Sequence, residues 1–412
     1  MYISRHIEGR LQNLSQHFKV ILVTGARQVG KSTLLAHMLP GLEHIAFNPV
    51  EDTYGAKKDP KLFLQNFLPP VILDEIQYVP ELLAFIKLIV DQEKKKGLYY
   101  LTGSHNLSIL KNVSESLAGR VGVINLGGMT PFELYHQKNS SWIPFYIKDP
   151  DKLLTKTKGL LKPDRTLYEL IWRGSLPEVI QLPDHVVSDY YSSYVQTYVE
   201  RDIRFLENSI DLSQFSKFIG ITAALTAQEI NYMRLGKDTG GISNLTAHKW
   251  LNLLKYSYQW RELSAYSGNT IKRISKKTKG YISDTGLACY LHKLSSPSAL
   301  ANHPLFGSLF ETFCINMIHN VFSGYMQPRA YHWRSSGGAE VDLILEMDGT
   351  LYPIEIKSRS YLTKFDARGI KAFMDTYPTK KIAPGVIIYT GPQYYKLEEY
   401  VYAIPWNMLC HE

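Results

Sequence analysis

A glycine-rich turn between an apolar strand and an amphipathic helix constrains this chain more than any other feature. Residues 19–39 read KVILVTGARQVGKSTLLAHML, and the turn fits the pattern G-x-x-x-x-G-K-[ST] from Gly25 to Ser32. A strand, such a turn and a helix in this order surround an anion with backbone N–H groups and the positive end of the helix. The sequence therefore predicts a parallel α/β sheet that binds phosphate groups at this turn.

The predicted phosphate loop supplies the contacts to a nucleotide, which we expect to be ATP or ADP. Lys31 would reach the β- and γ-phosphates, and the Ser32 hydroxyl would help to hold Mg²⁺. The loop residues expected to contact the nucleotide are Gly25, Ala26, Arg27, Gln28, Val29, Gly30, Lys31, Ser32 and Thr33.

A second apolar strand ends in two carboxylates. Residues 69–79 read PPVILDEIQYV, and we expect this strand to lie beside the strand of the phosphate loop in the parallel sheet. Asp74 would then bind Mg²⁺ through water, and Glu75 would activate the attacking water. This pair predicts hydrolysis of the nucleotide and not binding alone.

Two further elements complete the predicted nucleotide site. A third strand within residues 97–106 ends in polar Thr102, Ser104 and Asn106, of which Ser104 or Asn106 is favoured as the sensor of the γ-phosphate. Arg120 lies between a helical stretch and a strand. It is either an arginine finger, acting in its own subunit or on a neighbouring one, or a surface residue of a loop.

Composition restricts the class of protein. A chain of 412 residues is long enough for several domains. Its three cysteines are scattered, which excludes a disulfide framework and a cysteine-rich zinc site and favours a reducing cytoplasm. The sequence shows no apolar run typical of a signal peptide or of a membrane span, so we expect a cytoplasmic protein without membrane contact.

Positive charge is concentrated in the middle of the chain. The formal net charge is +8, and residues 201–280 contain 13 Lys and Arg against 6 Asp and Glu. This excess predicts a polyanion as partner, although a solvated basic face would give the same count.

The order of elements in this basic segment favours a winged helix that binds DNA. Short amphipathic helices between 205 and 265 precede an apparent hairpin within residues 262–284. Helix 244–256, capped by Ser243 or Asn244, would be the recognition helix and would present His248, Lys249 and Lys255 to phosphates. The basic residues expected on the wing are Lys272, Arg273, Lys276, Lys277 and Lys279. RNA binding or docking of a protein are the alternatives.

The hairpin GAEVDLILEMDGTLYPIEIK, residues 338–357, places like charges opposite each other. Counting outward from the turn at Asp348-Gly349 sets Asp342 against Glu355, with Lys357 on the same face as Glu355. Opposed like charges repel, so a positive charge is expected between them. Pro353 cannot donate a hydrogen bond to a neighbouring strand, which predicts an edge position or a bulge.

The elements around this hairpin give it the order of a PD-(D/E)XK nuclease core. A helix within 303–322 precedes it and carries Glu311, while a helical stretch and a strand follow it. Glu311, Asp342 and Glu355 would hold Mg²⁺ or Mn²⁺, Lys357 would orient or deprotonate water, and Glu340 would line the rim. The alternative is a salt-bridged hairpin in which Lys357 alone neutralises the carboxylates.

The whole chain resembles a family of bacterial and archaeal AAA-like, STAND-related P-loop ATPases with winged-helix and PD-(D/E)XK nuclease-like parts. The motifs that carry this resemblance are GARQVGKSTLL, VILDEIQ, LTGS, SLAGRV, YVERDI, KGYISDTGLACYL, FETF and GAEVDLIL…PIEIKS. The resemblance implies ATPase roles for Lys31, Ser32, Asp74 and Glu75, and a finger or sensor role for Arg120. It implies a nuclease-like set of Glu311, Asp342, Glu355 and Lys357.

We therefore expect an α/β protein in four parts: a P-loop ATPase domain (1–145), a helical lid (146–205), a winged helix (206–292) and a PD-(D/E)XK nuclease-like domain (293–412). The expected function is a Mg²⁺-dependent ATPase that controls binding of DNA and its metal-dependent cleavage. The alternative is an ATP-driven molecular switch whose nuclease-like domain only binds DNA or protein. Assembly into a homo-oligomer is expected if Arg120 acts on a neighbouring subunit.

Overall fold

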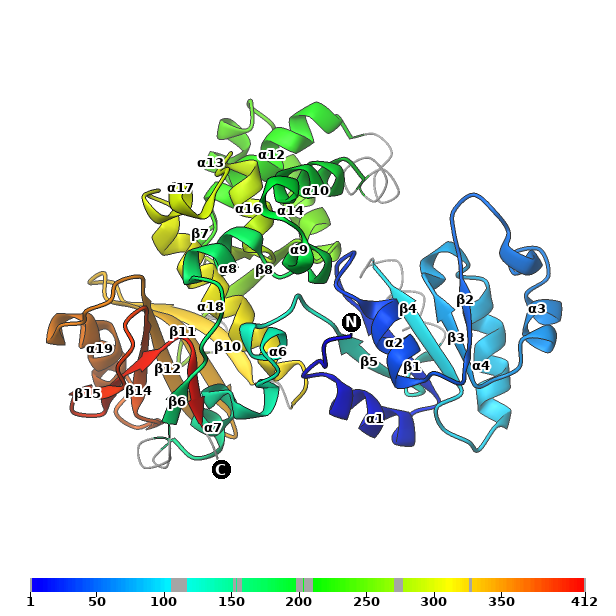
Figure 1. Cartoon of the computed structure of the whole chain (residues 1–412), viewed down its shortest axis with the longest axis horizontal. Helices are drawn as coiled ribbons and strands as arrows, with labels where there is room; N and C mark the ends of the chain where they lie inside the picture. Colours follow the sequence, from blue (N-terminus) through cyan, green and yellow to red (C-terminus); the bar gives the residue numbers. More distant parts are fainter. Residues whose placement is uncertain are drawn as a thin grey trace. The chain divides into compact units, whose positions relative to one another are not determined.

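The computed structural model divides into two compact units (Figure 1). The first comprises residues 1–129 with the short segments 254–259 and 323–325, and the second comprises the remainder. The boundary thus lies between Met129 and Thr130, ahead of the predicted residue 145. The structure describes residues 2–104, 117–150, 153, 158–197, 203, 210–269, 277–325 and 328–410.

The first unit is built on a five-stranded parallel sheet in the order β2-β3-β4-β1-β5. Every residue of β1, β3 and β4 is buried, as expected for parallel strands that are covered on both faces. The predicted parallel α/β sheet is therefore confirmed. The strands are β1 (Val20–Thr24), β2 (Glu43–Ala46), β3 (Val71–Asp74), β4 (Tyr99–Gly103) and β5 (Val121–Asn125).

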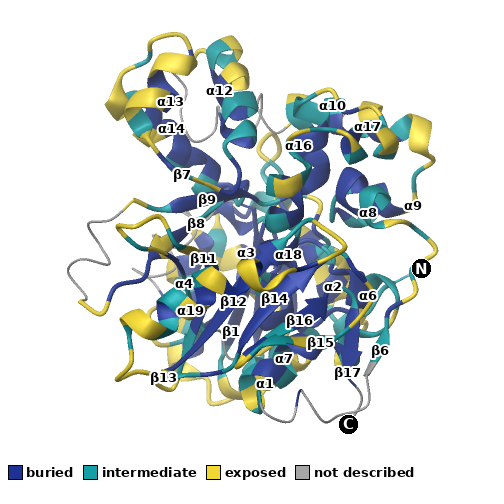
Figure 2. Cartoon of the chain, turned by 90° about the vertical axis from the view of Figure 1, so that its left-hand side faces the viewer, coloured by how far each residue is buried: buried dark blue, intermediate teal, exposed yellow. Residues whose placement is uncertain are grey.

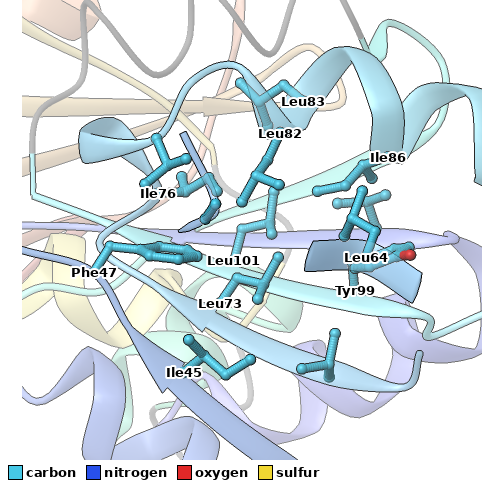
Figure 3. Close-up of a cluster of buried hydrophobic side chains, with 14 of the residues drawn as sticks. Ile45, Phe47, Leu64, Leu73, Ile76, Leu82, Leu83, Ile86, Tyr99 and Leu101 are labelled. Atoms are coloured by element: carbon cyan, nitrogen blue, oxygen red, sulfur yellow. The ribbon is translucent and has the colours of Figure 1, made fainter. Parts of the chain in front are cut away.

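Helices cover this sheet and bury its apolar side chains. Figure 3 shows Leu73 and Leu101 from the strands packed with Leu82, Leu83 and Ile86, which come from α4. The release of such apolar area from water is the main stabilising contribution, about 25 cal/mol per Å² buried. The helical segments of this unit are α1 (Glu8–His17), α2 (Lys31–Met38), η1 (Thr53–Gly55), α3 (Pro60–Asn66), η2 (Ile76–Tyr78) and α4 (Leu82–Gln92).

The predicted neighbour of the phosphate-loop strand was wrong. Strand β3, which ends at Asp74, does not lie beside β1, because β4 is inserted between them: Tyr99 of β4 pairs with Val71 on one side and with Val20 on the other. The apolar pattern of a strand predicts burial in a parallel sheet but does not specify its neighbours. As a consequence Thr102, near the end of β4, lies between the two strands that carry the nucleotide-site residues.

The second unit contains a ten-stranded sheet in the order β15-β16-β14-β12-β11-β10-β8-β9-β7, with β13 beside β12, and a separate pair β17-β6. Figure 2 shows β12 and β14 as buried strands. The strands are β6 (Lys158–Leu160), β7 (Gln228–Glu229), β8 (Trp260–Ala265), β9 (Lys279–Ile282), β10 (Arg329–Arg334), β11 (Glu340–Met347), β12 (Thr350–Lys357), β13 (Lys381–Ile382), β14 (Gly385–Tyr389), β15 (Tyr395–Glu398), β16 (Val401–Pro405) and β17 (Met408–Cys410).

Helices form the remainder of the second unit. In the described part of the chain, no helix is both long enough and apolar enough to cross a membrane. The helical segments are α6 (Pro131–Leu134), η3 (Lys138–Ser140), α7 (Trp142–Lys148), α8 (Leu167–Arg173), α9 (Pro177–Gln181), α10 (Asp184–Thr197), α12 (Leu212–Ala224), α13 (Tyr232–Asp238), α14 (Asn244–Tyr256), α16 (Thr285–Leu291), α17 (Pro297–Ala301), α18 (Phe306–Phe322), η6 (Lys364–Ala367) and α19 (Arg368–Thr376).

The register of the C-terminal hairpin agrees with the prediction. Met347 pairs with Thr350, and the ladder continues without a shift to Leu343 opposite Ile354. The edge position predicted from Pro353 was wrong, because β12 lies inside the sheet between β11 and the strands β13 and β14. Pro353 is tolerated there because it falls in the interval between the residues of β12 that pair with β13 and those that pair with β14.

The hairpin after α14 belongs to the same sheet as the C-terminal hairpin. Strand β8 pairs in parallel with β10, through Tyr331 opposite Ser264, and β10 pairs with β11. From the sequence we expected these strands in two separate domains, 206–292 and 293–412, and β10 was not predicted. The predicted helix 244–256 coincides with α14, and the Ser243 hydroxyl accepts a hydrogen bond from the Thr246 N–H.

The segment predicted as a lid of the ATPase domain lies in the second unit. Helix α7 contacts α18 and β17, and β6 pairs with β17 through Leu160 opposite Met408. Helices α8 and α10 contact α16. The sequence could not show this, because the partner of β6 is at the other end of the chain.

A buried carboxylate holds the helices of this unit together. Asp284 Oδ1 accepts hydrogen bonds from Tyr191 Oη (2.7 Å) and from the Leu287 N–H at the start of α16 (2.8 Å). Its Oδ2 accepts from the N–H (2.7 Å) and hydroxyl (2.8 Å) of Ser175, in the turn after α8. Gly174 (φ +75°) permits this approach, since a Cβ there would lie 2.4 Å from Asp284 Oδ1.

We predict that Asp284→Ala lowers the free energy of unfolding by about 3 kcal/mol, because it removes a helix cap and leaves buried donors without acceptors. Urea unfolding of the full chain measures this change. The matched control is Asp238→Ala, which removes an exposed carboxylate paired with Arg234 and is expected to change stability by less than about 1 kcal/mol. Equal effects of the two substitutions would contradict the prediction.

Candidate functional site

The backbone of the phosphate loop is shaped by two glycines. The loop follows β1 and leads into α2, which begins at Lys31. Gly25 has φ +148°, and a Cβ there would lie 2.2 Å from the Leu126 carbonyl oxygen. Gly30 has φ +94°, a conformation that side chains rarely adopt. Both glycines are therefore required for the loop to close around an anion.

Lys31 lies within this loop. Its side chain is buried, and Nζ donates to the carbonyl oxygens of Gly25 (3.2 Å) and Ala26 (2.9 Å). Arg27 donates to Tyr78 Oη at 3.0 Å, whereas Thr33 is exposed on α2. The loop thus combines an ammonium group with the N-terminus of a helix, and this combination fits phosphate.

A hydroxyl and a carboxylate meet beside the loop. Ser32 Oγ donates to Asp74 Oδ2 at 2.7 Å, and His44 Nε2 lies 3.5 Å from the same oxygen. The Thr102 hydroxyl donates to Asp74 Oδ1. Because hydroxyl and carboxylate oxygens are the hard ligands that Mg²⁺ prefers, Ser32 and Asp74 fit the predicted metal.

Glu75 has a left-handed backbone conformation (φ +58°), and hydrogen bonds to neighbouring residues hold its backbone and its side chain. Its N–H donates to Thr102 Oγ1 (3.0 Å), and its Oε2 accepts from Ser104 Oγ (3.0 Å) and from Gln77 Nε2. Burial alone would raise the pKa of Glu75, but Lys31 and the Gln77 amide lower it more, so the net pKa lies below its usual value. Glu75 is therefore ionised at neutral pH and able to accept a proton from water.

The structure adds two residues to the predicted site. Thr102 was named as a candidate sensor but not favoured, and it joins Asp74 to the backbone of Glu75. Gln77 was not predicted, and it contacts both Glu75 and Ser104. The signal for Thr102 was a hydroxyl near the end of an apolar strand, and its importance follows only from the strand order. Asn106 lies outside the described residues.

Arg120 lies at the opposite end of the strands from the phosphate loop. It precedes β5, its carbonyl accepts from the Val20 N–H at the start of β1, and its guanidinium pairs with Asp91. The phosphate loop follows the other end of β1, roughly 15 Å away for a five-residue strand. A finger role within its own subunit is therefore not supported, and a role on a neighbouring copy stays a prediction.

The predicted nuclease-like carboxylates contact a lysine that had been assigned to the wing. Lys279 Nζ lies 2.6 Å from Glu311 Oε1 and 2.9 Å from Asp342 Oδ1. Lys279 is only 9% exposed, so its predicted contact with DNA phosphates was wrong. Tyr281 Oη also donates to Glu311 Oε1 (2.7 Å), and the Ile356 N–H donates to Asp342 Oδ2 (3.0 Å).

Glu355 is paired with Lys357, as the salt-bridged alternative predicted. Lys357 Nζ lies 2.5 Å from Glu355 Oε1. The second oxygen, Oε2, is buried and has no hydrogen-bond partner within the described structure. It lies close to α19, since a Cβ added at Gly369 would be 3.5 Å from it. The neutralising charge is therefore shared between Lys357 and Lys279, not supplied by Lys357 alone.

Burial and mutual repulsion shift the pKa values of the carboxylates in this cluster. Burial and the charge of Asp342 raise the pKa of Glu311 to about 7 and raise the pKa of Glu355 well above its usual value. Burial would also raise the pKa of Asp342, but Lys279 and Lys357 lower it to below its usual value. No group of three or more His, Cys, Asp and Glu side chains in the described ranges is arranged to hold a metal ion. The Lys279 ammonium bonds two of the three predicted metal ligands, Glu311 and Asp342, and metal binding by this set stays a prediction.

The predicted DNA-contact surface is described only in part. His248 and Lys249 are exposed on α14, and Lys255 is half-buried. Lys277 is exposed, and its carbonyl accepts from His332 Nε2 at 3.0 Å. Three wing residues lie outside the described residues: Lys272, Arg273 and Lys276.

Three family models match successive parts of the chain. Residues 17–135 match the AAA domain, residues 164–298 match a domain of unknown function, DUF8612, and residues 306–409 match another, DUF4143. The first match covers the phosphate loop, Asp74, Glu75 and Thr102. This match agrees with the parallel sheet and the phosphate loop of this part of the chain.

Similar proteins extend over nearly the whole chain. Two uncharacterized proteins, from Mycobacterium bovis and Mycobacterium tuberculosis, are each 27% identical over 98% of this chain and 84% of their own length. A Walker-type ATPase of Pyrococcus abyssi aligns with 69% of this chain and 94% of its own at 16% identity and a TM-score of 0.45. The RuvB protein of Thermotoga maritima aligns with 63% of this chain and 89% of its own at 13% identity and a TM-score of 0.30.

We predict that Thr102→Val lowers the rate of ATP hydrolysis by about 10-fold or more, because the Asp74 carboxylate and the Glu75 N–H lose the hydroxyl that joins them. ATP affinity should remain within about 3-fold of the wild type, since the phosphate loop is untouched. Phosphate release and equilibrium binding of a fluorescent ATP analogue measure the two quantities.

The control for this substitution is Thr376→Val, which removes an exposed hydroxyl at the end of α19. It should leave the rate unchanged. A Thr102→Val protein that hydrolyses ATP at the wild-type rate would show that the hydrogen bonds of Thr102 with Asp74 and Glu75 have no role in hydrolysis.

Proposed function

We propose that this chain is a Mg²⁺-dependent ATPase in which Glu75 activates the attacking water. The arrangement of Glu75 carries this proposal: its carboxylate is ionised, is oriented by Ser104 and Gln77, and adjoins the Asp74–Ser32 pair at the edge of the sheet where the phosphate loop begins. A surface carboxylate would not require two side-chain donors to fix its direction.

Each part of the site has a distinct role in the proposed reaction. The loop N–H groups and Lys31 bind the phosphates, and Ser32 and Asp74 hold the metal. When bound, Mg²⁺ supplies positive charge for the phosphate oxygens. Glu75 accepts a proton from water as that water attacks the terminal phosphate. Thr102 holds Asp74 and Glu75 in position through its hydrogen bonds with both.

We predict that Glu75→Gln retains ATP binding but reduces hydrolysis by about 100-fold or more, because the amide cannot accept the proton. Lys31→Ala should instead abolish binding. Phosphate release measures the first effect, and calorimetric titration with ATP measures the second.

A matched control distinguishes loss of the base from loss of charge. Glu81→Gln neutralises an exposed carboxylate in the same domain, just before α4, and should leave the rate within about 2-fold. Hydrolysis by Glu75→Gln at the wild-type rate would overturn the proposed role of Glu75.

The second unit is proposed to bind nucleic acid under the control of ATP turnover, with DNA as the first candidate. The order α12, β7, α13, α14, β8, β9, with β9 pairing to β7 and β8, supports a winged helix at residues 210–282. Exposed His248 and Lys249 on α14 and the basic composition of residues 201–280 support a polyanion partner. Arg120 acting on a neighbouring copy would make the ATPase a homo-oligomer.

The nuclease-like part favours a switch over a nuclease. The order α18, β11, β12, α19, β14 supports a PD-(D/E)XK-type core. Lys279, however, bonds Glu311 and Asp342, two of the carboxylates that would bind the metal. We therefore favour the ATP-driven switch, in which this domain binds DNA or protein without cleaving it.

We predict that supercoiled, linear and single-stranded DNA remain intact with Mg²⁺ or Mn²⁺, with or without ATP, to the same extent for the wild type and for Asp342→Asn. The control is Asp348→Asn, an exposed residue in the turn of the same hairpin. Cleavage that is lost only in Asp342→Asn would establish the nuclease and contradict the switch.

A further inference from the structure

We propose that Lys279 is the resident cation of the carboxylate cluster formed by Glu311, Asp342 and Glu355, and that its ammonium group excludes a divalent cation from it. This inference rests on the nuclease-like part of the proposed function and is independent of ATP hydrolysis. It concerns four elements of the second unit: β9, which carries Lys279, and α18, β11 and β12, which carry the three carboxylates.

The position of the ammonium group supports this exclusion. Nζ lies 2.6 Å from Glu311 Oε1 and 2.9 Å from Asp342 Oδ1, so it contacts two of the three carboxylates of the cluster. Mg²⁺ requires oxygen ligands at about 2.0–2.1 Å, and these two oxygens cannot approach it while both hold the ammonium. A divalent ion beside a buried ammonium would also meet strong repulsion at low dielectric.

Two further carboxylate oxygens are engaged by donors from the same chain, whereas Glu355 Oε2 is buried without a partner in the described structure. Asp342 Oδ2 accepts the Ile356 N–H, and Lys357 bonds Glu355 Oε1. Tyr281 adds its hydroxyl to the Glu311 oxygen that Lys279 bonds. N–H and O–H groups therefore occupy four oxygens of the cluster, which in a metal site would direct their lone pairs at the ion.

A pocket gives a divalent ion access to the side of the cluster where Lys279 and Glu311 lie. A pocket of about 340 Å³ is lined by Lys279 and Glu311, together with Glu229, Arg334 and Glu340. A hydrated ion can enter a space of this size. An ion can therefore reach the part of the cluster where the ammonium group of Lys279 meets Glu311.

Two opposite effects are expected when the ammonium is removed. Without Lys279, Glu311 and Asp342 lose their neutralising partner, which destabilises the fold. The same loss frees the oxygens for a divalent ion, whose binding would restore stability by mass action. Destabilisation that Mn²⁺ reverses separates the proposed role from that of an ordinary structural ion pair.

The test is Mn²⁺ binding by the full chain without nucleotide, followed by electron paramagnetic resonance and by the melting temperature. We compare the wild type, Lys279→Met and the control Lys277→Met, which removes an exposed lysine two residues earlier. The wild type and Lys277→Met should bind no Mn²⁺ that depends on Asp342. Lys279→Met should melt lower, gain one Mn²⁺ site that Asp342→Asn removes, and recover stability with Mn²⁺.

Two results would overturn the proposal. One is Mn²⁺ binding by the wild type that Asp342→Asn abolishes, and the other is a folded Lys279→Met that gains no site. If Lys279→Met does not fold, the comparison of the wild type with Asp342→Asn decides: equal Mn²⁺ binding supports exclusion and unequal binding refutes it. Mn²⁺ that binds at Ser32 and Asp74 does so in all variants and does not affect the comparison between them. The outcome therefore stays the same even if the chain does not hydrolyse ATP.

Discussion

A carboxylate buried within a sheet must be compensated by hydrogen bonds or by positive charge, and two aspartates of this chain meet that requirement differently. Asp74 is compensated by the hydroxyls of Ser32 and Thr102. Hydroxyls carry no charge and are themselves oxygen ligands, so the negative charge of Asp74 remains available to a metal. Asp342 is compensated by the Lys279 ammonium and a backbone N–H, so its charge is already partly neutralised.

This contrast explains why similar motifs lead to different conclusions for the two candidate sites. At each site the sequence places an aspartate on an apolar strand close to a glutamate. At the first site the neighbouring lysine, Lys31, belongs to the phosphate loop and bonds backbone carbonyls. At the second, Lys279 bonds the carboxylates directly. The chemistry therefore follows from where each lysine is directed, which motif spacing does not specify.

Local features of the fold were predictable because they depend on short stretches of chain. The turn at Asp348-Gly349 fixes the hairpin register, and the spacing of Trp250 and Leu254 predicts the buried face of α14. The insertion of β4 between β3 and β1 was not predictable, because apolar strands are interchangeable in a parallel sheet. The sequence therefore predicted roles for Asp74 and Glu75 but did not favour Thr102, whose contacts with both depend on that insertion.

Lys279 shows the same limit for charged residues. It follows a basic run in which Lys277 is exposed, and nothing in that run distinguishes one lysine from the other. The distinction arises because β9 joins the sheet that contains β11, so a side chain expected in solvent meets Asp342.

The segment KGYISDTGLA, residues 279–288, is a structural junction of the second unit. Its first residue, Lys279, is bonded to α18 and β11, while Asp284 five positions later is bonded to the turn after α8 and to α10. Both charged side chains are thus committed to buried partners. Because Lys279 is bonded to buried carboxylates, the positive charge offered to the proposed polyanion partner is smaller than the composition implies. If the second unit binds a polyanion as proposed, exposed lysines such as Lys277 provide the phosphate contacts, which give affinity more than recognition of a base sequence.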